Sequence, residues 1–568
     1  MRKVFSFLGA VLFSASLLAD AAPYAASSAN GSGAVATVHP LATEAGLNAL
    51  ARGGNAIDAA VAAAFTLGVV DSHNSGIGGG NFGVIHWADG SVEAFDGREM
   101  APAAAHRDMY LVDGKGDISL SMTGPLAVGI PGSLAVYQAM HKRAGEVSWK
   151  DLVLPAADLA ERGFALNNAV AGRLAAKAED LAKFPGSADI LLDDKGQPWP
   201  AGHHLVQKDL ANTYRQVAAK GGDYFYRGKF ASAVAQWMKD NGGIITADDF
   251  ANYQMKIREP VISQYRGHTV YGFPPPSAGG VNVAQMLNIL EGFDVASLSE
   301  AQRYHLLAEA MKIAFADRAH FLGDPDFVPV PKGLIDPAYA AERAKLINLK
   351  RVAEGVSYGS PPRADVDLFG KHTTHLVTAD KWGNWVSITT TVNTSFGSKI
   401  IVPGTGLVLN NQMDDFSTQP GVPNAFGLVG AEANSVAAGK RPLSSMSPTI
   451  IVRDGKPVMA LGAAGGPTIT TQVVQNIVNV IDLGMSAEQA LATQRVHHQW
   501  APDMLFAEKN MPVELQESLK AMGHNVNPRS WGGTSQMIRA KPGGGFEAAS
   551  EPRVIARNAE ASERMNDE

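Results

Sequence analysis

Apolar residues recur along this chain at both helical and strand spacing. Residues 55–70, "NAIDAAVAAAFTLGVV", have the spacing of an amphipathic helix with Asn55 as its N-cap, and residues 301–323 predict a second long helix. Residues 76–102 predict a strand hairpin with an Asp-Gly turn. After residue 373 strands dominate, with helices expected near 470–484 and 486–495. This mixture predicts an α/β or α+β protein, compatible with one intertwined domain.

The first 21 residues have the pattern of an export signal. "MRK" is positively charged, "VFSFLGAVLFSASLL" is apolar but short for a membrane span, and Ala19–Ala21 offers small residues for cleavage after Ala21. No cysteine follows for lipid attachment, and no later stretch has 18 uncharged apolar residues. We therefore expect a soluble mature protein, periplasmic or secreted, with no stable membrane anchor. The alternative is a buried N-terminal helix.

Composition excludes several kinds of chemistry. The 568 residues include no cysteine, which removes disulfides, zinc–thiolate sites, iron–sulfur clusters and cysteine nucleophiles. The net charge of −7, with no basic block, argues against nucleic acid as a partner. The glycine-rich run 76–80 leads into a predicted strand, which favours a tight backbone approach over a phosphate cradle. His497 and His498 are adjacent and would face opposite sides of a strand, so one metal is not expected to bind both.

The most informative stretch is residues 373–393, "TTHLVTADKWGNWVSITTTVN". Two strand patterns flank the turn "DKWGN", and symmetry about Trp382 places Ala379 opposite Trp385 and Thr373 opposite Thr391. Strand alternation then puts Asn393 on the same face as Thr391. A plain threonine-rich strand remains the competing interpretation, because threonine is a good strand former.

Thr373 is also a candidate nucleophile. No histidine–acid pair is evident as its base, but its own α-amine could serve if the chain were cut between His372 and Thr373. Such an amine has a pKa of about 7.7–8.0, close to working pH. The polar segment 349–371 predicts a linker or mobile tail, which would suit a segment that must be released.

Several motifs resemble the γ-glutamyltranspeptidase family. They are residues 373–398, "LNNQMDDFS" (409–417), "KRPLSSMSPTI" (440–450) and "GAAGG" (462–466), with "DGREMAP" and "ADRAHFLGDPDF" upstream. The resemblance covers essentially the whole mature chain. It implies an α+β, αββα N-terminal-nucleophile hydrolase fold with two stacked antiparallel sheets between helical layers. It also implies a self-cleaving precursor, with a large subunit of residues 22–372, a small subunit of residues 373–568, and no cofactor or metal.

The resemblance also assigns roles to residues at the matching positions. Thr373 would be the nucleophile and Thr391 the residue that orients it, with the amides of Gly465 and Gly466 forming the oxyanion hole. The α-carboxylate of the substrate would be held by Arg98, assisted by Ser444 and Ser445. The α-ammonium would be received by Asn393, Gln412 and Asp415. Without the resemblance, Arg98 could be an ordinary salt-bridged arginine, the serine pair a turn, and the aspartate pair a helix cap.

The implied activity is transfer of the γ-glutamyl group from glutathione and γ-glutamyl amides to water, amino acids or peptides. One alternative is a cephalosporin or glutaryl acylase of the same superfamily, although the complete ammonium-binding set argues against it. Another is a non-catalytic scaffold, which would stay one chain.

Phe426, in residues 421–430, departs from the family pattern, since close bacterial relatives have tyrosine there. Our hypothesis is a lid that is latched less tightly. Unchanged hydrolysis and transfer kinetics in Phe426→Tyr would count against it.

Overall fold

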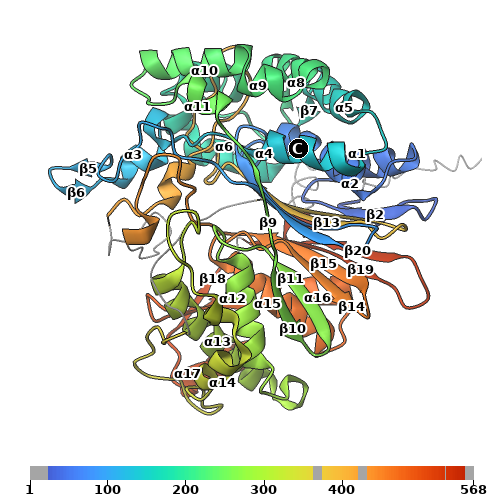
Figure 1. The fold of residues 1–568 in the computed structure, drawn as a ribbon, viewed down its shortest axis with the longest axis vertical. Helices are drawn as coiled ribbons and strands as arrows, with labels where there is room; N and C mark the ends of the chain where they lie inside the picture. Colours follow the sequence, from blue (N-terminus) through green and yellow to red (C-terminus); the bar gives the residue numbers. More distant parts are fainter. Residues whose placement is uncertain (1–22, 362–373, 420–431, 531–532, 557–568) are drawn as a thin grey trace, which may run out of the picture.

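Two antiparallel sheets lie face to face between two layers of helices (Figure 1). The computed structural model describes residues 23–361, 374–419, 432–530 and 533–556. The seven-stranded sheet has the order β1-β2-β12-β13-β3-β4-β9, and the six-stranded sheet has the order β10-β11-β14-β15-β19-β20. The predicted αββα arrangement is therefore confirmed.

The strands of the two sheets come from both halves of the sequence. The seven-stranded sheet contains β1 Ala25–Ser27, β2 Gly33–Ala36, β3 Gly80–His86, β4 Val92–Gly97, β9 Lys256–Arg258, β12 Thr374–Asp380 and β13 Trp385–Thr391. The six-stranded sheet contains β10 Val261–Tyr265, β11 His268–Gly272, β14 Thr449–Arg453, β15 Lys456–Ala464, β19 Thr534–Ala540 and β20 Phe546–Ser550. Smaller sheets use β5 Leu111–Val112 with β6 Lys115–Gly116, β7 Phe164–Ala165 with β8 His204–Leu205, and β16 Val496–His497, β17 Leu505–Glu508 and β18 Val526–Arg529.

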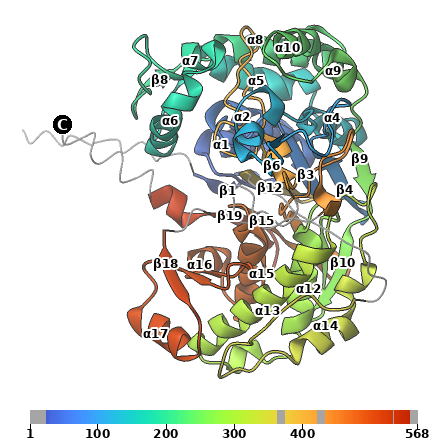
Figure 2. The same cartoon turned by 90° about the vertical axis from the view of Figure 1, so that its left-hand side faces the viewer.

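Each sheet is covered by its own helices (Figures 1 and 2). Those on the side of the seven-stranded sheet are α1 Pro40–Ala51, α2 Ala56–Val70, α3 Ile118–Met122, α4 Ser133–Ala144, α5 Trp149–Arg162, α6 Asn168–Leu181, α7 Pro185–Leu191, α8 Lys208–Lys220, α9 Gly222–Tyr226, α10 Lys229–Asp240 and α11 Ala247–Ala251. Those on the side of the six-stranded sheet are α12 Gly279–Leu290, α13 Glu300–Phe321, α14 Pro337–Ala344, α15 Thr468–Ile481, α16 Ala487–Ala492 and α17 Val513–Ala521.

Three apolar layers hold this sandwich together. One lies between the first helical layer and the seven-stranded sheet, around Phe65. A second lies between the sheets, where Phe82 stacks on Phe273 with ring centroids 4.0 Å apart. The third joins the six-stranded sheet to the second helical layer, around Met311. Because both faces of the seven-stranded sheet are covered, every residue of its central strands β3, β12 and β13 is buried.

Helix α2 shows where the sequence pattern was only partly right. Asn55 caps it as predicted, accepting from the Ile57 and Asp58 amides, while Asp58 accepts from the Asn55 amide. However, all 15 of its residues are buried, so the helix has no solvent-exposed face. Its small alanine side chains allow neighbouring elements to pack on every side.

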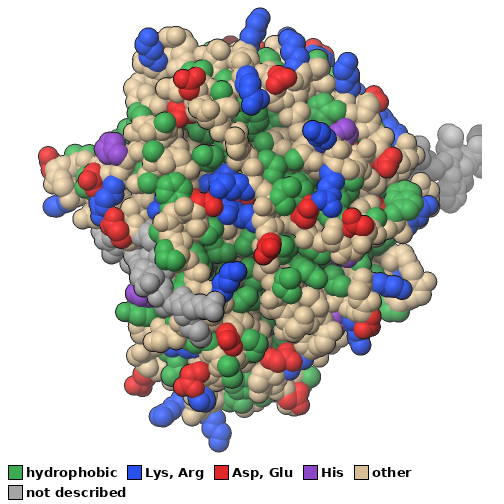
Figure 3. All heavy atoms as spheres, viewed as in Figure 1, with side chains coloured by type: hydrophobic (Ala, Val, Ile, Leu, Met, Phe, Trp, Pro, Cys, Tyr) green, Lys and Arg blue, Asp and Glu red, His purple; other side chains and the backbone are tan. Residues whose placement is uncertain are grey.

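Among the described residues, no helix is long and apolar enough to cross a membrane. On the face shown in Figure 3, acidic and basic side chains intermingle.

Candidate functional site

The hairpin of β12 and β13 has the register expected from the sequence. Ala379 lies opposite Trp385, and Thr374 lies opposite Thr390. His372, Thr373 and Phe426 lie outside the described residues. The pairing of Thr373 with Thr391 and the lid hypothesis therefore stay predictions.

The chain turns directly after Thr391, so the strand alternation used to place Asn393 beside Thr391 does not extend to Asn393. β13 ends at Thr391, and Asn393 has a φ of 77°. The Asn393 amide donates to Thr391 Oγ1 at 2.8 Å, and its Nδ2 donates to the Asn411 carbonyl at 3.0 Å. Asparagine tolerates left-handed backbone better than most residues, a local preference that strand alternation does not reveal. The turn nevertheless keeps Asn393 beside Thr391.

The glycine-rich run 76–80 brings another segment against this turn. A Cβ on Gly79 would lie 1.8 Å from the Thr391 carbonyl oxygen, and one on Gly78 would lie 2.1 Å from the Val408 carbonyl oxygen. Gly80 begins β3 and lies opposite Thr391. The predicted tight backbone approach is confirmed.

A buried ion pair joins two of the predicted substrate-binding residues. Arg98, just after β4, donates from Nη2 to Asp415 Oδ2 and to the Leu443 carbonyl at 3.1 Å. Asp415 ends a short 3₁₀ turn, Gln412–Asp415, in which Gln412 Nε2 donates to Asp415 Oδ2 at 3.4 Å. Arg98, Gln412 and Asp415 are fully buried. The groups predicted to hold opposite ends of a zwitterion therefore lie side by side and neutralise each other.

Around this pair, several buried atoms have no hydrogen-bond partner among the described residues. Three of them belong to predicted substrate-binding residues: Arg98 Nη1, Asn393 Oδ1 and Gln412 Oε1. Buried polar atoms are rarely left unpaired in native structures, so three together point to a ligand. One is a cationic donor and two are neutral acceptors, which suits a carboxylate and an ammonium group.

The serine pair lies next to the same arginine but uses its hydroxyl groups in two ways. Ser444 Oγ accepts from the Met446 amide at 3.0 Å, and Ser445 Oγ accepts from Arg318 Nη2 at 2.6 Å. Arg318 is on α13 and was missed in the sequence, although it stands in the motif "ADRAHFLGDPDF". Burial holds the pKa of Arg318 well below its usual range, and the charge of Asp415 opposes this shift.

Glu99 is a further buried group that the sequence analysis missed. It follows Arg98 directly, and Arg98 Nη1 lies 3.6 Å from Glu99 Oε2. Burial raises the pKa of Glu99 to about 8, in spite of the opposing charge of Arg98. Glu99 is therefore mostly protonated at neutral pH, which leaves Asp415 as the counter-ion of Arg98.

The loop after α2 contacts the start of β12 and the residue that follows β13. Thr374 Oγ1 donates to Asp71 Oδ2 at 2.5 Å, and the Val392 amide donates to the Asn74 carbonyl at 2.9 Å. Burial raises the pKa of Asp71 to about 6, although its hydrogen bonds from Thr374 and Asn74 oppose the rise. The only sequence signal for this loop was a polar cluster, "DSHNS", at the end of a helix.

Gly465 and Gly466 lie between the end of β15 and the start of α15. Their φ angles are +131° and +65°, a region that disfavours other residues. Neither amide donates to another of the residues that the structure describes. On the same strand, a Cβ on Gly462 would lie 2.3 Å from His375 Cε1, so β15 packs against the beginning of β12.

The segment leading toward the predicted cleavage point is anchored as far as Gly359, which corrects the expectation of a loose tail from 349. The Ala353 amide donates to Glu309 Oε2 and the Gly359 amide donates to Asp317 Oδ1, both at 2.7 Å. Buried carboxylates need donors, and these amides supply them. Composition alone could not show this, because the partners lie more than 40 residues upstream.

One group of described residues has metal-ligand chemistry: His305, Glu309 and His524. His305 Nδ1 lies 2.7 Å from His524 Nε2. Two nitrogens bound to one tetrahedral zinc at about 2.0–2.1 Å would stand about 3.3 Å apart. The spacing is that of a hydrogen bond, and the group belongs to the core around α13 rather than to the site.

Comparison with known proteins gives one consistent family. The family model described as gamma-glutamyltranspeptidase matches residues 42–561. The chain is 42% identical over 527 residues to the glutathione hydrolase proenzyme of Escherichia coli K12, covering 92% of this chain and 90% of that protein. It is 40% identical over 531 residues to the acylase ACY 1 proenzyme of Pseudomonas sp. SE83, covering 91% of each. The crystal structure of cephalosporin acylase from Bacillus halodurans superposes with a TM-score of 0.83 at 28% identity, covering 92% of this chain and 94% of that one.

Proposed function

Because this chain belongs to the γ-glutamyltranspeptidase family and has its N-terminal-nucleophile hydrolase fold, we propose that it is a self-cleaving glutathione hydrolase and γ-glutamyltransferase with Thr373 as nucleophile. The substrates are glutathione and other γ-glutamyl amides, and the acceptors are water, amino acids or peptides. Residues 22–372 and 373–568 are the large and small subunits of the mature heterodimer.

Maturation begins on the precursor chain. Thr373 Oγ attacks the carbonyl carbon of His372, the peptide nitrogen leaves as the α-amine of Thr373, and an ester links the two residues. Water then hydrolyses this ester, which frees the His372 carboxylate and the Thr373 hydroxyl. The new α-amine is the base that the unprocessed chain lacks.

The observation that carries the proposal is the buried Arg98–Asp415 pair with its unpaired neighbours. A γ-glutamyl head group brings one α-carboxylate and one α-ammonium. The carboxylate binds the Arg98 guanidinium, while the ammonium donates to Asp415, Asn393 Oδ1 and Gln412 Oε1. Substrate binding thus replaces the Arg98–Asp415 ion pair by two ion pairs between protein and substrate. The substrate also supplies partners for the unpaired atoms, so these interactions offset the cost of burying the charges.

Catalysis then follows the order of acyl transfer. The Thr373 amine takes the proton of the Thr373 hydroxyl, and Oγ attacks the γ-carbonyl carbon. The Gly465 and Gly466 amides donate to the oxyanion, and Thr391 orients the nucleophile. The amine of the substrate's scissile amide bond then leaves with this proton, and a γ-glutamyl ester of Thr373 remains. Water or an acceptor amine breaks that ester.

A glutaryl or cephalosporin acylase is the second candidate, favoured by the similarity to the two acylases. A glutaryl group has no α-ammonium and would leave Asn393 Oδ1 and Gln412 Oε1 unpaired. Hydrolysis of γ-glutamyl-p-nitroanilide beside glutaryl-p-nitroanilide separates the two candidates.

The deciding experiment is a denaturing gel of wild type beside Thr373→Ala, with activity measured on each. We expect two chains and activity for the wild type, and one inactive chain for the variant. A wild type that stays uncut and inactive would refute the proposal. N-terminal sequencing of the exported protein tests the accompanying proposal that residues 1–21 are removed on export to the periplasm or medium.

A further inference from the structure

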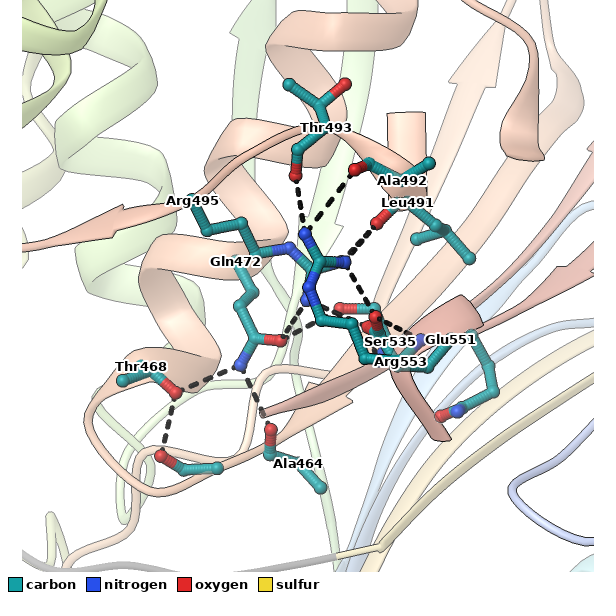
Figure 4. Close-up of polar contacts among 12 residues, drawn as sticks. Ala464, Thr468, Gln472, Leu491, Ala492, Thr493, Arg495, Ser535, Glu551 and Arg553 are labelled. Atoms are coloured by element: carbon teal, nitrogen blue, oxygen red, sulfur yellow. Dashed lines mark hydrogen bonds and ion pairs between the residues drawn. The ribbon is translucent and has the colours of Figure 1, made fainter. Parts of the chain in front are cut away.

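A chain of buried polar contacts ends on the two carbonyl groups next to the Gly465 and Gly466 amides (Figure 4). Gln472 Nε2 donates to the Ala464 carbonyl at 3.0 Å and to Thr468 Oγ1 at 3.0 Å. Thr468 Oγ1 in turn donates to the Gly465 carbonyl at 2.8 Å. Both side chains come from the first turns of α15, where a spacing of four residues places them on one face.

The directions of these two carbonyl groups determine the directions of the Gly465 and Gly466 N–H bonds. The Ala464 carbonyl and the Gly465 amide belong to one planar peptide group, and the Gly465 carbonyl and the Gly466 amide belong to the next. In a trans peptide the C=O and N–H bonds point in opposite directions. Holding each oxygen toward Gln472 and Thr468 therefore directs each N–H away from them.

The orientation of the Gln472 carboxamide is itself determined by its partners. Its Oε1 accepts from Arg495 Nη1 at 2.9 Å and from Ser535 Oγ at 3.2 Å. A guanidinium group only donates, so the atom facing Arg495 must be the oxygen and the NH₂ must face Ala464. All four hydrogen-bonding positions of this fully buried side chain are used.

Close packing holds the same carboxamide against two neighbouring backbone segments. A Cβ on Gly465 would lie 2.6 Å from Thr468 Oγ1, 2.8 Å from Gly533 Cα and 3.1 Å from Gln472 Nε2. A Cβ on Gly533 would lie 2.3 Å from Gln472 Nε2. Glycine at both positions leaves room for the side chain that clamps the turn.

Arg495 is fixed by a balanced set of buried charges. Its Nη1 donates to Glu551 Oε2 at 2.8 Å, and Arg553 Nη1 donates to Glu551 Oε1 at 2.8 Å. Arg553 also pairs with Glu508 through Nε at 2.6 Å. Burial alone would raise the pKa of Glu551, but the two guanidinium groups hold it below its usual range, so the carboxylate remains charged.

We propose that Gln472 and Thr468 are positioning residues that aim the Gly465 and Gly466 amides at the reacting carbonyl, with Arg495 and Glu551 fixing the orientation of Gln472. This inference rests on the oxyanion role given to the glycine pair under the proposed function. The hydrogen bonds also polarise both peptide groups, because bonds in a chain strengthen one another. The positive charge of Arg495, at one end of this chain of hydrogen bonds, thereby favours negative charge at the other end, where the Gly465 and Gly466 N–H bonds point.

The test compares Gln472→Leu with Gln475→Leu on the processed enzyme. Gln475 is a matched control, because it is buried on the same helix and its carboxamide also bonds to backbone groups, those of Thr471 and Val496, but none of these belongs to the glycine turn. Loss of one oxyanion donor lowers kcat about 10²–10³-fold. In Gln472→Leu the Gly465 and Gly466 amides lose their orientation, so kcat is expected to fall about tenfold or more. KM for γ-glutamyl-p-nitroanilide should change by less than about threefold, because ground-state contacts are intact. Gln475→Leu should lower Tm without lowering kcat.

A second measurement separates the orientation of the two amides from a general loss of structure in the site. A γ-glutamyl boronic acid, in which boron replaces the γ-carbonyl carbon, forms a tetrahedral adduct with the Thr373 hydroxyl. Its Ki should rise in Gln472→Leu by the factor that kcat falls, while the Ki of glutamate stays constant. An equal rise for both ligands, or wild-type kcat, would overturn the proposal.

If Gln472→Leu does not fold, Thr468 decides the matter. Thr468→Val should reduce kcat and boronate affinity, and Thr468→Ser should restore both, because serine keeps the hydroxyl. Equal kcat and equal boronate affinity in Thr468→Val and Thr468→Ser would overturn the proposed positioning role. Failure of the proposed function would be seen separately, as a wild type that is uncut or inactive on γ-glutamyl-p-nitroanilide.

Discussion

Replacing Asp415 by asparagine is expected to reduce turnover of γ-glutamyl substrates far more than turnover of glutaryl substrates. Asp415 is fully buried, so solvent does not screen its bond to the substrate ammonium. A hydrogen bond to a charged group contributes about 1.5–3 kcal/mol. At 1.36 kcal/mol per tenfold, its loss lowers kcat/KM about 10- to 150-fold. A glutaryl amide has no ammonium, so its kcat/KM should change little.

The variant should still fold, because Glu99 can replace the lost charge. Burial raises the pKa of Glu99 to about 8, and the charge of Asp415 adds to this rise. Without Asp415, Glu99 can ionise and neutralise Arg98. The loss of stability should therefore stay below the roughly 3–5 kcal/mol expected when a buried charge loses its only partner.

The assay measures kcat/KM for γ-glutamyl-p-nitroanilide and glutaryl-p-nitroanilide on the same preparations of wild type and Asp415→Asn. Because both substrates meet the same protein molecules, differences in folding or processing cancel in the ratio. An equal loss on both substrates would show that Asp415 acts through Arg98 or the fold, and would refute its role in binding the ammonium.

Two further substitutions test the surroundings of the hairpin. Burial raises the pKa of Asp71 from 3.8 to about 6, so the folded state holds an extra proton between these values and the wild type loses stability as pH rises from about 4 to 6. Asp71→Asn should remove this contribution, and Tm curves of the two proteins that run parallel from pH 4 to 7 would contradict it. Gly79→Ala should lower the free energy of unfolding by about 3 kcal/mol or more, because its Cβ would collide with the Thr391 carbonyl. Gly172→Ala, on α6 with open space around it, should instead add about 0.5–1 kcal/mol, and similar shifts for both variants would refute the packing argument.

Features of the site that depend on local pattern could be predicted from the sequence. The register of β12 with β13 followed from a symmetric five-residue turn, and the structure confirms it down to Thr374 opposite Thr390. The glycine run 76–80 was correctly interpreted as a close approach. Asn393 lies beside Thr391 as predicted, but through a left-handed turn rather than through the strand alternation that the prediction used.

Features that depend on distant partners could not be predicted in this way. Arg98 and Asp415 are 317 residues apart, and no periodicity connects them. Their predicted proximity came only from the family resemblance. The anchoring of residues 352–359 was missed because the buried carboxylates that hold them lie on α13. Gln472 was missed because its role depends on neighbours from three other segments, Ala464, Arg495 and Ser535.

The strand order has a consequence for the life of the processed enzyme. In the seven-stranded sheet, β12 and β13 lie between β2 and β3, so strands from after the proposed cut are bordered on both sides by strands from before it. In the six-stranded sheet, β11 from before the cut pairs with β14 from after it. Neither product could leave without breaking the ladders of both sheets. Cleavage would thus yield two subunits that stay together and do not exchange with those of other molecules. Two differently labelled preparations mixed in native buffer should form no hybrid molecules. The lifetime of the subunit pair should equal the unfolding time of the whole protein.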